Sequence, residues 1–464
     1  MSHSDARTLD PEILREYDIR GITSENFGAE DVFVIGRAFA AILQGRGGKT
    51  CAVGYDGRLT SPELESALVK GLTKSGIDVT RIGCGPTPML YFAGATLGVD
   101  AALMITGSHN PSEYNGIKMT IGGKSFFGDD IRKLGEVAAL GAFVDGDGVA
   151  KELNIFDDYV SRVFQDFRGD KELTVAWDPG NGAAGDVVTQ LIEKLPGNHH
   201  IINGEIDGTF PAHHPDPTVE KNLDQLKALV AEKNCDIGFG FDGDGDRIGM
   251  IDSQGRVLWG DQIMALAARE VLADEPGATI IADVKASQLF VDEIERLGGK
   301  PMIWKTGHSH IKTKMYETGS PLAGEMSAHI FFKHRYYGYD DAVYTAVRMM
   351  SLVASSDQSL DQMYDSLPKM LNTPEIRIDC TEDRKFVIIE EVRERLKGVD
   401  GISVNEIDGV RVSNADGWWL LRASNTQAVL VARCESDTEE GLSRLKGLLC
   451  AEIEASGVTP PDLG

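Results

Sequence analysis

Ser108 lies in a loop of small and polar residues whose composition could support covalent group transfer. The loop Thr106-Gly107-Ser108-His109-Asn110-Pro111 follows an apolar run at residues 101–105. Such a run predicts a buried strand, so the Ser108 hydroxyl would lie where that strand ends. A serine in such a place can carry a transferred group covalently. Taken alone, the pattern also fits a turn that Ser108 and Asn110 merely cap.

A second loop places three aspartates at alternate positions. Asp242, Asp244 and Asp246 alternate with glycines after the apolar run at residues 237–241. Three carboxylates and an oxygen of a phosphorylated Ser108 would together suit Mg²⁺. An EF-hand calcium loop does not fit, because Arg247 occupies its glycine position and its twelfth residue is Ser253. A solvated acidic turn is the remaining alternative.

A third loop could bind sugar hydroxyls. Glu325, Ser327 and His329 follow a strand-like segment at residues 321–323 and alternate along the chain. In an extended segment these side chains would point to one side. A carboxylate, a hydroxyl and an imidazole together suit sugar hydroxyls, which both donate and accept hydrogen bonds. Ordinary loop polarity is the alternative.

A fourth loop could bind a phosphate that does not react. It lies between two predicted strands and carries Arg422, Ser424, Asn425 and Thr426. A guanidinium, two hydroxyls, an amide and free backbone N–H groups can clamp a phosphate. A plain hairpin turn is the alternative.

Two residues near Ser108 could assist the chemistry. Lys118 stands in a glycine-containing segment predicted to be a turn, where it would be a surface lysine, a charge clamp or a proton carrier with a lowered pKa. His109 follows Ser108 directly and either orients its hydroxyl or caps the loop. The residues alone do not decide between these roles.

The elements that must position these loops predict an α/β protein. Short apolar runs alternate with amphipathic helical patterns in three successive stretches, which predicts three α/β domains at residues 1–155, 156–257 and 258–369. Within the first, Ser61 before Pro62 is predicted to cap a helix. Residues 370–464 mix helices with alternating strands and predict a C-terminal α+β domain.

Length, charge and cysteine usage narrow the class of protein. The chain has 464 residues, a net charge of −26 and six scattered cysteines with no CxxC pair. The acidity opposes nucleic-acid binding, and no apolar stretch reaches the length of a membrane span. The first five residues do not resemble a signal peptide, and the scattered cysteines favour reduced thiols. We therefore expect a cytoplasmic enzyme whose phosphate sites are local islands of positive charge.

The four loops together resemble those of the α-D-phosphohexomutase superfamily, in their order and spacing across nearly the whole chain. The segments that carry the resemblance are residues 106–118, 242–247, 324–329 and 422–426. The chain most resembles the bacterial phosphomannomutase/phosphoglucomutase group. This likeness implies that the three α/β domains share one topology and that the four domains surround a central cleft.

The resemblance also implies roles for individual residues. Asp242, Asp244 and Asp246 would bind the metal together with Ser108. The implied catalytic residues are Ser108, Lys118, His329, His109 and Arg20. The implied substrate-binding residues are Tyr17, Arg247, Lys305, Gly307, His308, Glu325, Ser327, Arg422, Ser424, Asn425, Thr426 and Arg433.

The implied reaction interconverts hexose 1-phosphate and hexose 6-phosphate, of mannose or glucose, through phospho-Ser108 and a hexose 1,6-bisphosphate. Mg²⁺ would be the cofactor and glucose 1,6-bisphosphate an activator, in a monomer or weak dimer. A glucosamine phosphate mutase is an alternative, although Met326 favours the mannose/glucose group. A metal-dependent serine phosphatase and a calcium-binding interaction protein are the rival classes.

Two positions depart from the family pattern. Tyr55 stands in Gly54-Tyr55-Asp56-Gly57-Arg58 where many relatives carry arginine, and Ala328 replaces a common glycine of the sugar loop. We expect Ala328 to restrict the backbone of its loop. Neither change affects a predicted ligand, so both bear on substrate preference and not on reaction type.

Overall fold

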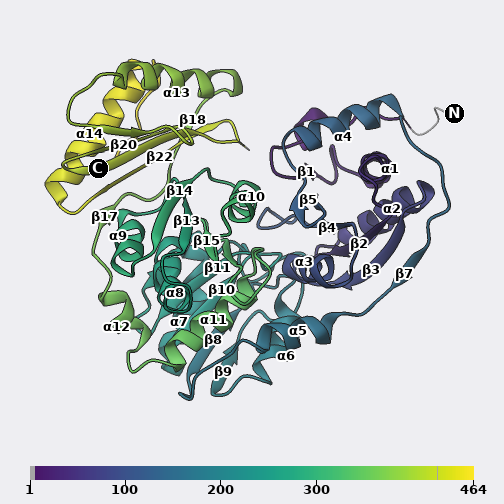
Figure 1. The fold of residues 1–464 in the computed structure, drawn as a ribbon, viewed down its shortest axis with the longest axis horizontal. Coiled ribbons are helices and arrows are strands. Elements are labelled where there is room, and N and C mark those ends of the chain that lie inside the picture. The colour runs from purple at the N-terminus through teal and green to yellow at the C-terminus, as the bar shows by residue number, and fades with distance from the viewer. Residues whose placement is uncertain (1–5, 426, 464) are drawn as a thin grey trace.

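The computed structural model describes residues 6–425 and 427–463, which form four sheets with their flanking helices. We number the corresponding domains I to IV (Figure 1). The sheet of domain I has the order β1 (Ile19–Ile22), β5 (Tyr114–Ile121), β4 (Ala101–Ile105), β2 (Thr50–Tyr55), β3 (Asp78–Cys84) and β7 (Ala150–Glu152), with β6 (Lys124–Ser125) paired to β5. Its helices are α1 (Ala29–Gly45), α2 (Ser61–Lys74), α3 (Thr87–Thr96) and α4 (Asp129–Leu140).

Domains II and III are built in the same way. The sheet of domain II has the order β12 (Val257–Leu258), β11 (Ile248–Asp252), β10 (Ile237–Phe241), β8 (Thr174–Asp178) and β9 (Asn198–Ile201), with α5 (Phe156–Phe164), α6 (Gly185–Ile192) and α7 (Asp224–Lys233). The sheet of domain III has the order β14 (Lys300–Trp304), β13 (Thr279–Asp283), β15 (Leu322–Gly324) and β16 (Ile330–Phe332). Its helices are α8 (Gly260–Asp274), α9 (Gln288–Arg296), α10 (His308–Thr318), α11 (Ala342–Ala354) and α12 (Leu360–Asp365).

One four-strand pattern recurs in these three sheets. Its strands are β3-β2-β4-β5 in domain I, β9-β8-β10-β11 in domain II and β14-β13-β15-β16 in domain III. In each case the first two pairings are parallel and the third is antiparallel. The shared topology that the sequence resemblance implied is therefore present. The antiparallel connection carries the Ser108 loop in domain I, the aspartate loop in domain II and the Glu325 loop in domain III.

Domain IV has a different, antiparallel sheet. Its order is β17 (Leu371–Asn372), β22 (Val429–Ser436), β21 (Gly417–Ala423), β20 (Val410–Asn414) and β19 (Ser403–Asn405), with β18 (Ile376–Asp379) also paired to β22. The helices α13 (Glu382–Leu396) and α14 (Glu439–Ala455) cover it. The predicted phosphate loop connects β21 to β22. In Figure 1 domain IV (green to yellow) and domain I (purple to blue) lie on opposite sides of the view, with domains II and III between and below them.

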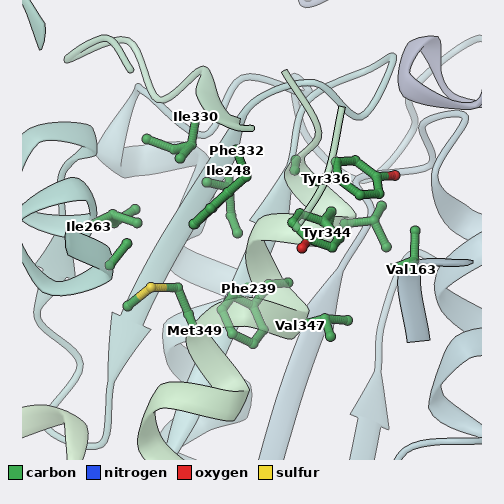
Figure 2. Packing of buried hydrophobic residues seen from close by; sticks show 14 of the residues in the cluster. Val163, Phe239, Ile248, Ile263, Ile330, Phe332, Tyr336, Tyr344, Val347 and Met349 are labelled. Carbon is green, nitrogen blue, oxygen red and sulfur yellow. The ribbon is translucent and has the colours of Figure 1, made fainter. Parts of the chain in front are cut away.

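A continuous apolar core joins the first three domains. It includes Met89 of domain I, Phe239 of domain II and Ile330 of domain III, each at most 1% exposed. Helix α11 follows the strands of domain III yet also packs against β10 and β11 of domain II, where Tyr344, Val347 and Met349 point into the cluster (Figure 2). The three loops on these sheets are therefore held on one packed framework. Domain IV has its own core.

Two local predictions differ from the structure. Thr60 is the residue before helix α2, and Ser61 is its first residue. The Ser61 hydroxyl donates a hydrogen bond of 2.6 Å to Asp56 Oδ1, because Asp56 lies at the end of the neighbouring strand. Lys118 lies within strand β5 and not in a turn. Among the described helices, none is both long and apolar enough to cross a membrane.

Candidate active site

Ser108 lies at the end of strand β4 in a conformation that directs its hydroxyl toward the aspartate loop. It is 3% exposed, and its φ of 50° lies in the left-handed region. Its backbone N–H donates to Thr106 Oγ1 over 2.8 Å. Its Oγ lies 3.3 Å from Asp242 Oδ2 and 3.3 Å from His109 Nδ1. The sequence-predicted nucleophile and one predicted metal ligand thus meet across two domains.

The three aspartates of the second loop form one buried cluster. Each is at most 1% exposed, and ligand oxygens of Asp242, Asp244 and Asp246 lie within 4.8 Å of one another. The loop is folded back by Asp242 Oδ1, which accepts the backbone N–H groups of Asp246 and Arg247 over 3.0 and 3.1 Å. Burial, together with the neighbouring carboxylates, raises the pKa of Asp242 well above its usual range. Asp244 Oδ1 is buried without a hydrogen-bond partner. These features fit a divalent cation, which would neutralise the cluster and bind the unpartnered oxygen.

Lys118 is an ion-pair partner of the aspartates and not a lysine with a lowered pKa. Its Nζ lies 2.7 Å from Asp244 Oδ2 and also pairs with Asp246. Burial alone would lower its pKa, but Asp244, Asp246 and Asp242 raise it above its ordinary value. Of the roles that the sequence left open, this environment favours the charge clamp, because the aspartates that surround the ammonium stabilise its charged form. Lys118 holds a positive charge beside the predicted metal ligands.

The Glu325 loop reaches the aspartates through His329. Its Nδ1 lies 2.9 Å from Glu325 Oε2, and its Nε2 lies 3.2 Å from Asp246 Oδ1. Burial disfavours the imidazolium, but the two carboxylates hold the pKa of His329 at about 9. Arg247 Nε lies 3.2 Å from the same imidazole Nε2. The loop turns instead of running extended as predicted, since Ala328 adopts a φ of 69°.

His109 and Arg20 lie close to Ser108, as the resemblance implied. Arg20 donates to the backbone oxygen of Gly107 and, over 3.1 Å, to Asn110 Oδ1. Burial and the nearby Arg247 and Arg20 guanidinium groups lower the pKa of His109 well below its usual range. His109 is consequently a neutral imidazole next to the hydroxyl.

The segment with Lys305, Gly307 and His308 begins helix α10 and contacts the other loops. The Gly307 N–H donates to Glu325 Oε1 over 2.6 Å. His308 faces the His329 ring at 5.5 Å between centroids, and its Nδ1 lies 3.8 Å from Asp340 Oδ2. Burial and the nearby Lys312 lower the pKa of His308 well below its usual range. Lys305 is exposed to solvent.

Domain IV approaches this group through Tyr17, Asn425 and Arg422. Tyr17 of domain I donates from its hydroxyl to the Thr306 backbone oxygen over 3.0 Å and accepts from Asn425 Nδ2 over 2.6 Å. Arg422 Nε donates to Asp408 Oδ2 over 3.0 Å. Ser424 lies in the same loop and is 7% exposed. Thr426 lies outside the described residues.

Arg433 and Ser327 are two predicted substrate-binding residues that lie beside the group around Ser108 and the aspartates. Arg433 donates to the backbone oxygen of Lys285 over 2.6 Å, and its guanidinium lies 5.9 Å from the Trp418 ring centroid. These contacts place Arg433 at the interface between domains III and IV, where it also contacts Met326 of the Glu325 loop. Ser327 is half-buried on the turn between Glu325 and His329.

Several residues of the site were not predicted from the sequence. Lys285 is 6% exposed and pairs with Glu375 over 3.0 Å at the junction of domains III and IV. Thr87 donates from its hydroxyl to Asp244. Asp408 accepts from both Thr306 and Arg422. Their sequence signal is a position at or near a strand or helix end, which does not reveal partners that lie 14 to 157 residues away.

Four family models match successive parts of the chain. They describe the α/β/α domains I, II and III and the C-terminal domain of phosphoglucomutase/phosphomannomutase, and they match residues 11–139, 157–255, 259–371 and 375–451. The chain belongs to the phosphoglucomutase/phosphomannomutase family. The family is consistent with the four loops, which lie one in each matched domain.

Curated and solved members of the phosphoglucomutase/phosphomannomutase family resemble the chain over nearly its full length. A phosphomannomutase/phosphoglucomutase of Pseudomonas aeruginosa is 42% identical over 98% of both chains. A phosphoglucomutase of Neisseria gonorrhoeae is 38% identical over 96% of this chain and 97% of its own. A solved family protein of Burkholderia thailandensis is 39% identical, with a TM-score of 0.92 over 97% of this chain and 98% of that chain.

Proposed function

We propose that this protein is a phosphohexomutase that interconverts hexose 1-phosphate and hexose 6-phosphate. The observation that carries the proposal is the meeting of Ser108 Oγ with Asp242 Oδ2 at 3.3 Å, between equivalent loops of two domains. The relatives named above are phosphomannomutases and phosphoglucomutases of similar length. A phosphosugar is therefore the substrate class, with mannose and glucose as the sugars to compare first.

The chain offers two regions for the two phosphates of a hexose bisphosphate. The Ser108 region would hold the reacting phosphoryl group, with Lys118, Arg20 and Arg247 providing positive charge close to it. The predicted phosphate loop of domain IV, which carries Arg422, Ser424 and Asn425, would hold the phosphate that does not react. Glu325 and Ser327 would bind the sugar hydroxyls between them. A phosphatase would have no use for the second phosphate region.

Proton positions follow from the surroundings of the histidines. His109 is neutral and 3.3 Å from Ser108 Oγ, so it can take the hydroxyl proton when a phosphoryl group returns to Ser108. His329 keeps its proton between Glu325 and Asp246 and would donate a hydrogen bond or proton toward the sugar oxygen. Proton transfer of this kind needs a group within hydrogen-bond reach, and the 3.3 Å between His109 Nδ1 and Ser108 Oγ supports this role for His109.

Asp242, Asp244 and Asp246 would hold the metal, and Mg²⁺ is the ion that their oxygen ligands favour. When bound, the ion would neutralise charge on the phosphoryl oxygens. A trace of glucose 1,6-bisphosphate would be required to phosphorylate Ser108. We further propose a monomer or weak dimer, and a cytoplasmic location in keeping with six free cysteines.

A coupled assay tests the proposal. Purified protein with Mg²⁺ and a trace of glucose 1,6-bisphosphate is given mannose, glucose or glucosamine 1-phosphate, while 6-phosphate formation and free phosphate are both followed. Ser108→Ala should abolish 6-phosphate formation and the mass increase of one phosphoryl group. Ser161→Ala, at an exposed position of helix α5, is the matched control. Free phosphate without isomerisation would assign the protein to the phosphatases.

A further inference from the structure

Arg58 is a fully buried charged residue that the proposed chemistry does not use. It belongs to the segment Asp56-Gly57-Arg58, which directly follows strand β2. Its side chain has no exposed surface, and that of Asp56 is 1% exposed. A buried guanidinium is costly unless all of its donors are satisfied. The groups that accept its hydrogen bonds should therefore show why a charged side chain is buried at this position.

All five N–H donors of Arg58 can be assigned, and four of their acceptors are backbone oxygens of the Ser108 loop or its continuation. Nη2 donates to the oxygens of Ser108 and Asn110 over 2.7 and 2.6 Å. Nη1 donates to the oxygens of Pro111 and Tyr114 over 2.6 and 3.0 Å. Nε lies 3.2 Å from Asp56 Oδ2. A lysine has only three donors and no planar fork, so it could not make this set.

These hydrogen bonds act on a loop that contains a residue in an unfavourable backbone conformation. Ser108 has a φ of 50°, a conformation that costs a non-glycine residue about 1 kcal/mol. The Gly107 N–H donates to Asp56 Oδ2 over 3.0 Å. A Cβ on Gly107 would lie 2.2 Å from Arg58 Nε, so the loop and the guanidinium are in direct contact. Asp56 and Arg58 together fix the backbone on both sides of the hydroxyl-bearing residue.

Domain II packs against the same group. The Phe210 ring centroid lies 5.1 Å from the Arg58 guanidinium carbon. On the other side of the loop, a Cβ on Gly243 would lie 2.4 Å from the Ser108 backbone oxygen. The Ser108 carbonyl is thus held between Arg58 and the aspartate loop. This contact sets the position of Ser108 relative to Asp242 and its neighbours.

Domain III has an aspartate and a cation at the equivalent positions, but its cation binds a different partner. In domain I, Tyr55 pairs with Ile105, the last residue of β4; in domain III, Ala282 pairs with Gly324, the last residue of β15. The residue after Tyr55 is Asp56 and the residue after Ala282 is Asp283, so these two aspartates correspond. By the same count Lys285 corresponds to Arg58. Asp283 accepts the Met326 N–H over 2.9 Å, as Asp56 accepts that of Gly107. Lys285, however, pairs with Glu375 of domain IV. Of these two cations, Arg58 binds the backbone of the neighbouring loop, whereas Lys285 binds a carboxylate of domain IV.

We propose that Arg58 is a positioning residue for Ser108, which holds the nucleophile loop against the aspartate loop through four backbone oxygens. This inference rests on the proposed function, because Ser108 is taken as the phosphoryl carrier. Arg58 acts through the loop and does not touch the substrate. Its loss should therefore reduce turnover more than substrate binding.

Arg58→Lys is the direct test, with Arg37→Lys as the matched control. Arg37 is a 3% exposed arginine of helix α1 in the same domain, and it pairs with Asp145 over 2.6 Å. For Arg58→Lys we expect kcat to fall about 100-fold, since a misplacement of about 1 Å can have that effect. KM for the hexose phosphate should change less than threefold. Phosphorylation of Ser108 by glucose 1,6-bisphosphate, followed by intact mass, should slow in parallel. Arg37→Lys should lower Tm without this fall in kcat.

Gly107→Ala provides a second test if Arg58→Lys does not fold. The added methyl group must displace the guanidinium, and kcat should again fall while KM stays. A folded Arg58→Lys or Gly107→Ala variant with kcat within twofold of the wild type would overturn the proposal. So would an Arg37→Lys variant whose kcat falls as much. If the wild-type protein itself shows no mutase activity and no phosphorylation of Ser108, the proposed function has failed instead.

Discussion

The hydroxyl of Tyr17 accepts a hydrogen bond of 2.6 Å from Asn425 Nδ2, although 408 positions separate the two residues in the sequence. The same hydroxyl donates to the Thr306 backbone oxygen over 3.0 Å. One phenol therefore joins domains I, III and IV. The predicted phosphate loop reaches the segment with Lys305, Gly307 and His308 through this contact.

Tyr17→Phe should lower kcat/KM for hexose phosphate by up to about 30-fold. The substitution removes two hydrogen bonds, each contributing about 1 kcal/mol, and so weakens the assembly of the phosphate loop. We expect most of the effect in KM. Steady-state kinetics with glucose 1-phosphate measures it. Tyr316→Phe, at a tyrosine that is 69% exposed, is the control and should be neutral. Equal kcat/KM for Tyr17→Phe and the wild type would exclude this role.

Lys118→Met should make the protein depend more strongly on a divalent cation for stability. Without the ammonium, Asp244 and Asp246 lose a buried partner, which should destabilise the metal-free protein by about 3 kcal/mol. Mg²⁺ bound to the three aspartates would restore part of the loss. Thermal unfolding in EDTA and in millimolar Mg²⁺ should show a larger increase in Tm for the variant than for the wild type.

Lys133→Met is the control for the lysine substitution. Lys133 pairs with Glu136 over 2.9 Å, but both side chains are about 60% exposed. Its removal should leave both Tm and the response to Mg²⁺ nearly unchanged. An identical response to Mg²⁺ in Lys118→Met and the wild type would argue against a metal at the aspartates.

Glu375→Gln should reduce stability at neutral pH and lose its effect in acid. The Lys285 charge lowers the pKa of Glu375 from 4.5 to about 2, against burial that would raise it. The folded state therefore favours the carboxylate, so the contribution to stability is fully present above about pH 4.5 and is lost as the pH falls toward 2. The shift corresponds to about 3 kcal/mol, and the 22% exposure of the side chain reduces our expectation to about 2 kcal/mol.

Urea unfolding at a series of pH values tests this dependence. The difference in unfolding free energy between the wild type and Glu375→Gln should be constant from pH 7 to about 5 and shrink below it. Glu382→Gln is the control, because Glu382 pairs with Lys385 over 2.7 Å but is 66% exposed. A difference that stays constant down to pH 3 would contradict the assigned ion pair.

Ala328→Gly should leave the protein equally stable or stabilise it by up to about 1.5 kcal/mol. Ala328 has a φ of 69°, where an alanine is strained by about 1–2 kcal/mol and glycine is not. The extra freedom of glycine in the unfolded chain offsets about 0.4–1 kcal/mol of that gain. Ala95→Gly, at an exposed position of helix α3, should instead destabilise by about 1 kcal/mol. Denaturant unfolding should therefore give changes in the free energy of unfolding that differ in sign, or clearly in magnitude, between the two variants.

The sequence predicted the elements and motifs whose chemistry is local. The apolar run at residues 101–105 became strand β4, and the loop after it carries Ser108. The three aspartates were predicted to share a site because alternate positions in a tight loop bring their oxygens together, and their ligand atoms do lie within 4.8 Å. The α/β class also followed from the alternation of apolar runs and helical patterns. In each case a few residues that are neighbours in the sequence determine the feature that was predicted.

The tertiary structure decided what surrounds those motifs. The position of Lys118 between Asp244 and Asp246 favoured the charge clamp among its possible roles, because the pKa of a lysine depends on the charges around it as well as on its burial. The turn at Ala328 replaced the predicted extended segment. Arg58 gave no sequence signal of its role. Sequence spacing specifies which groups a loop can offer, whereas the packing of whole domains determines which groups face each other and how far water is excluded.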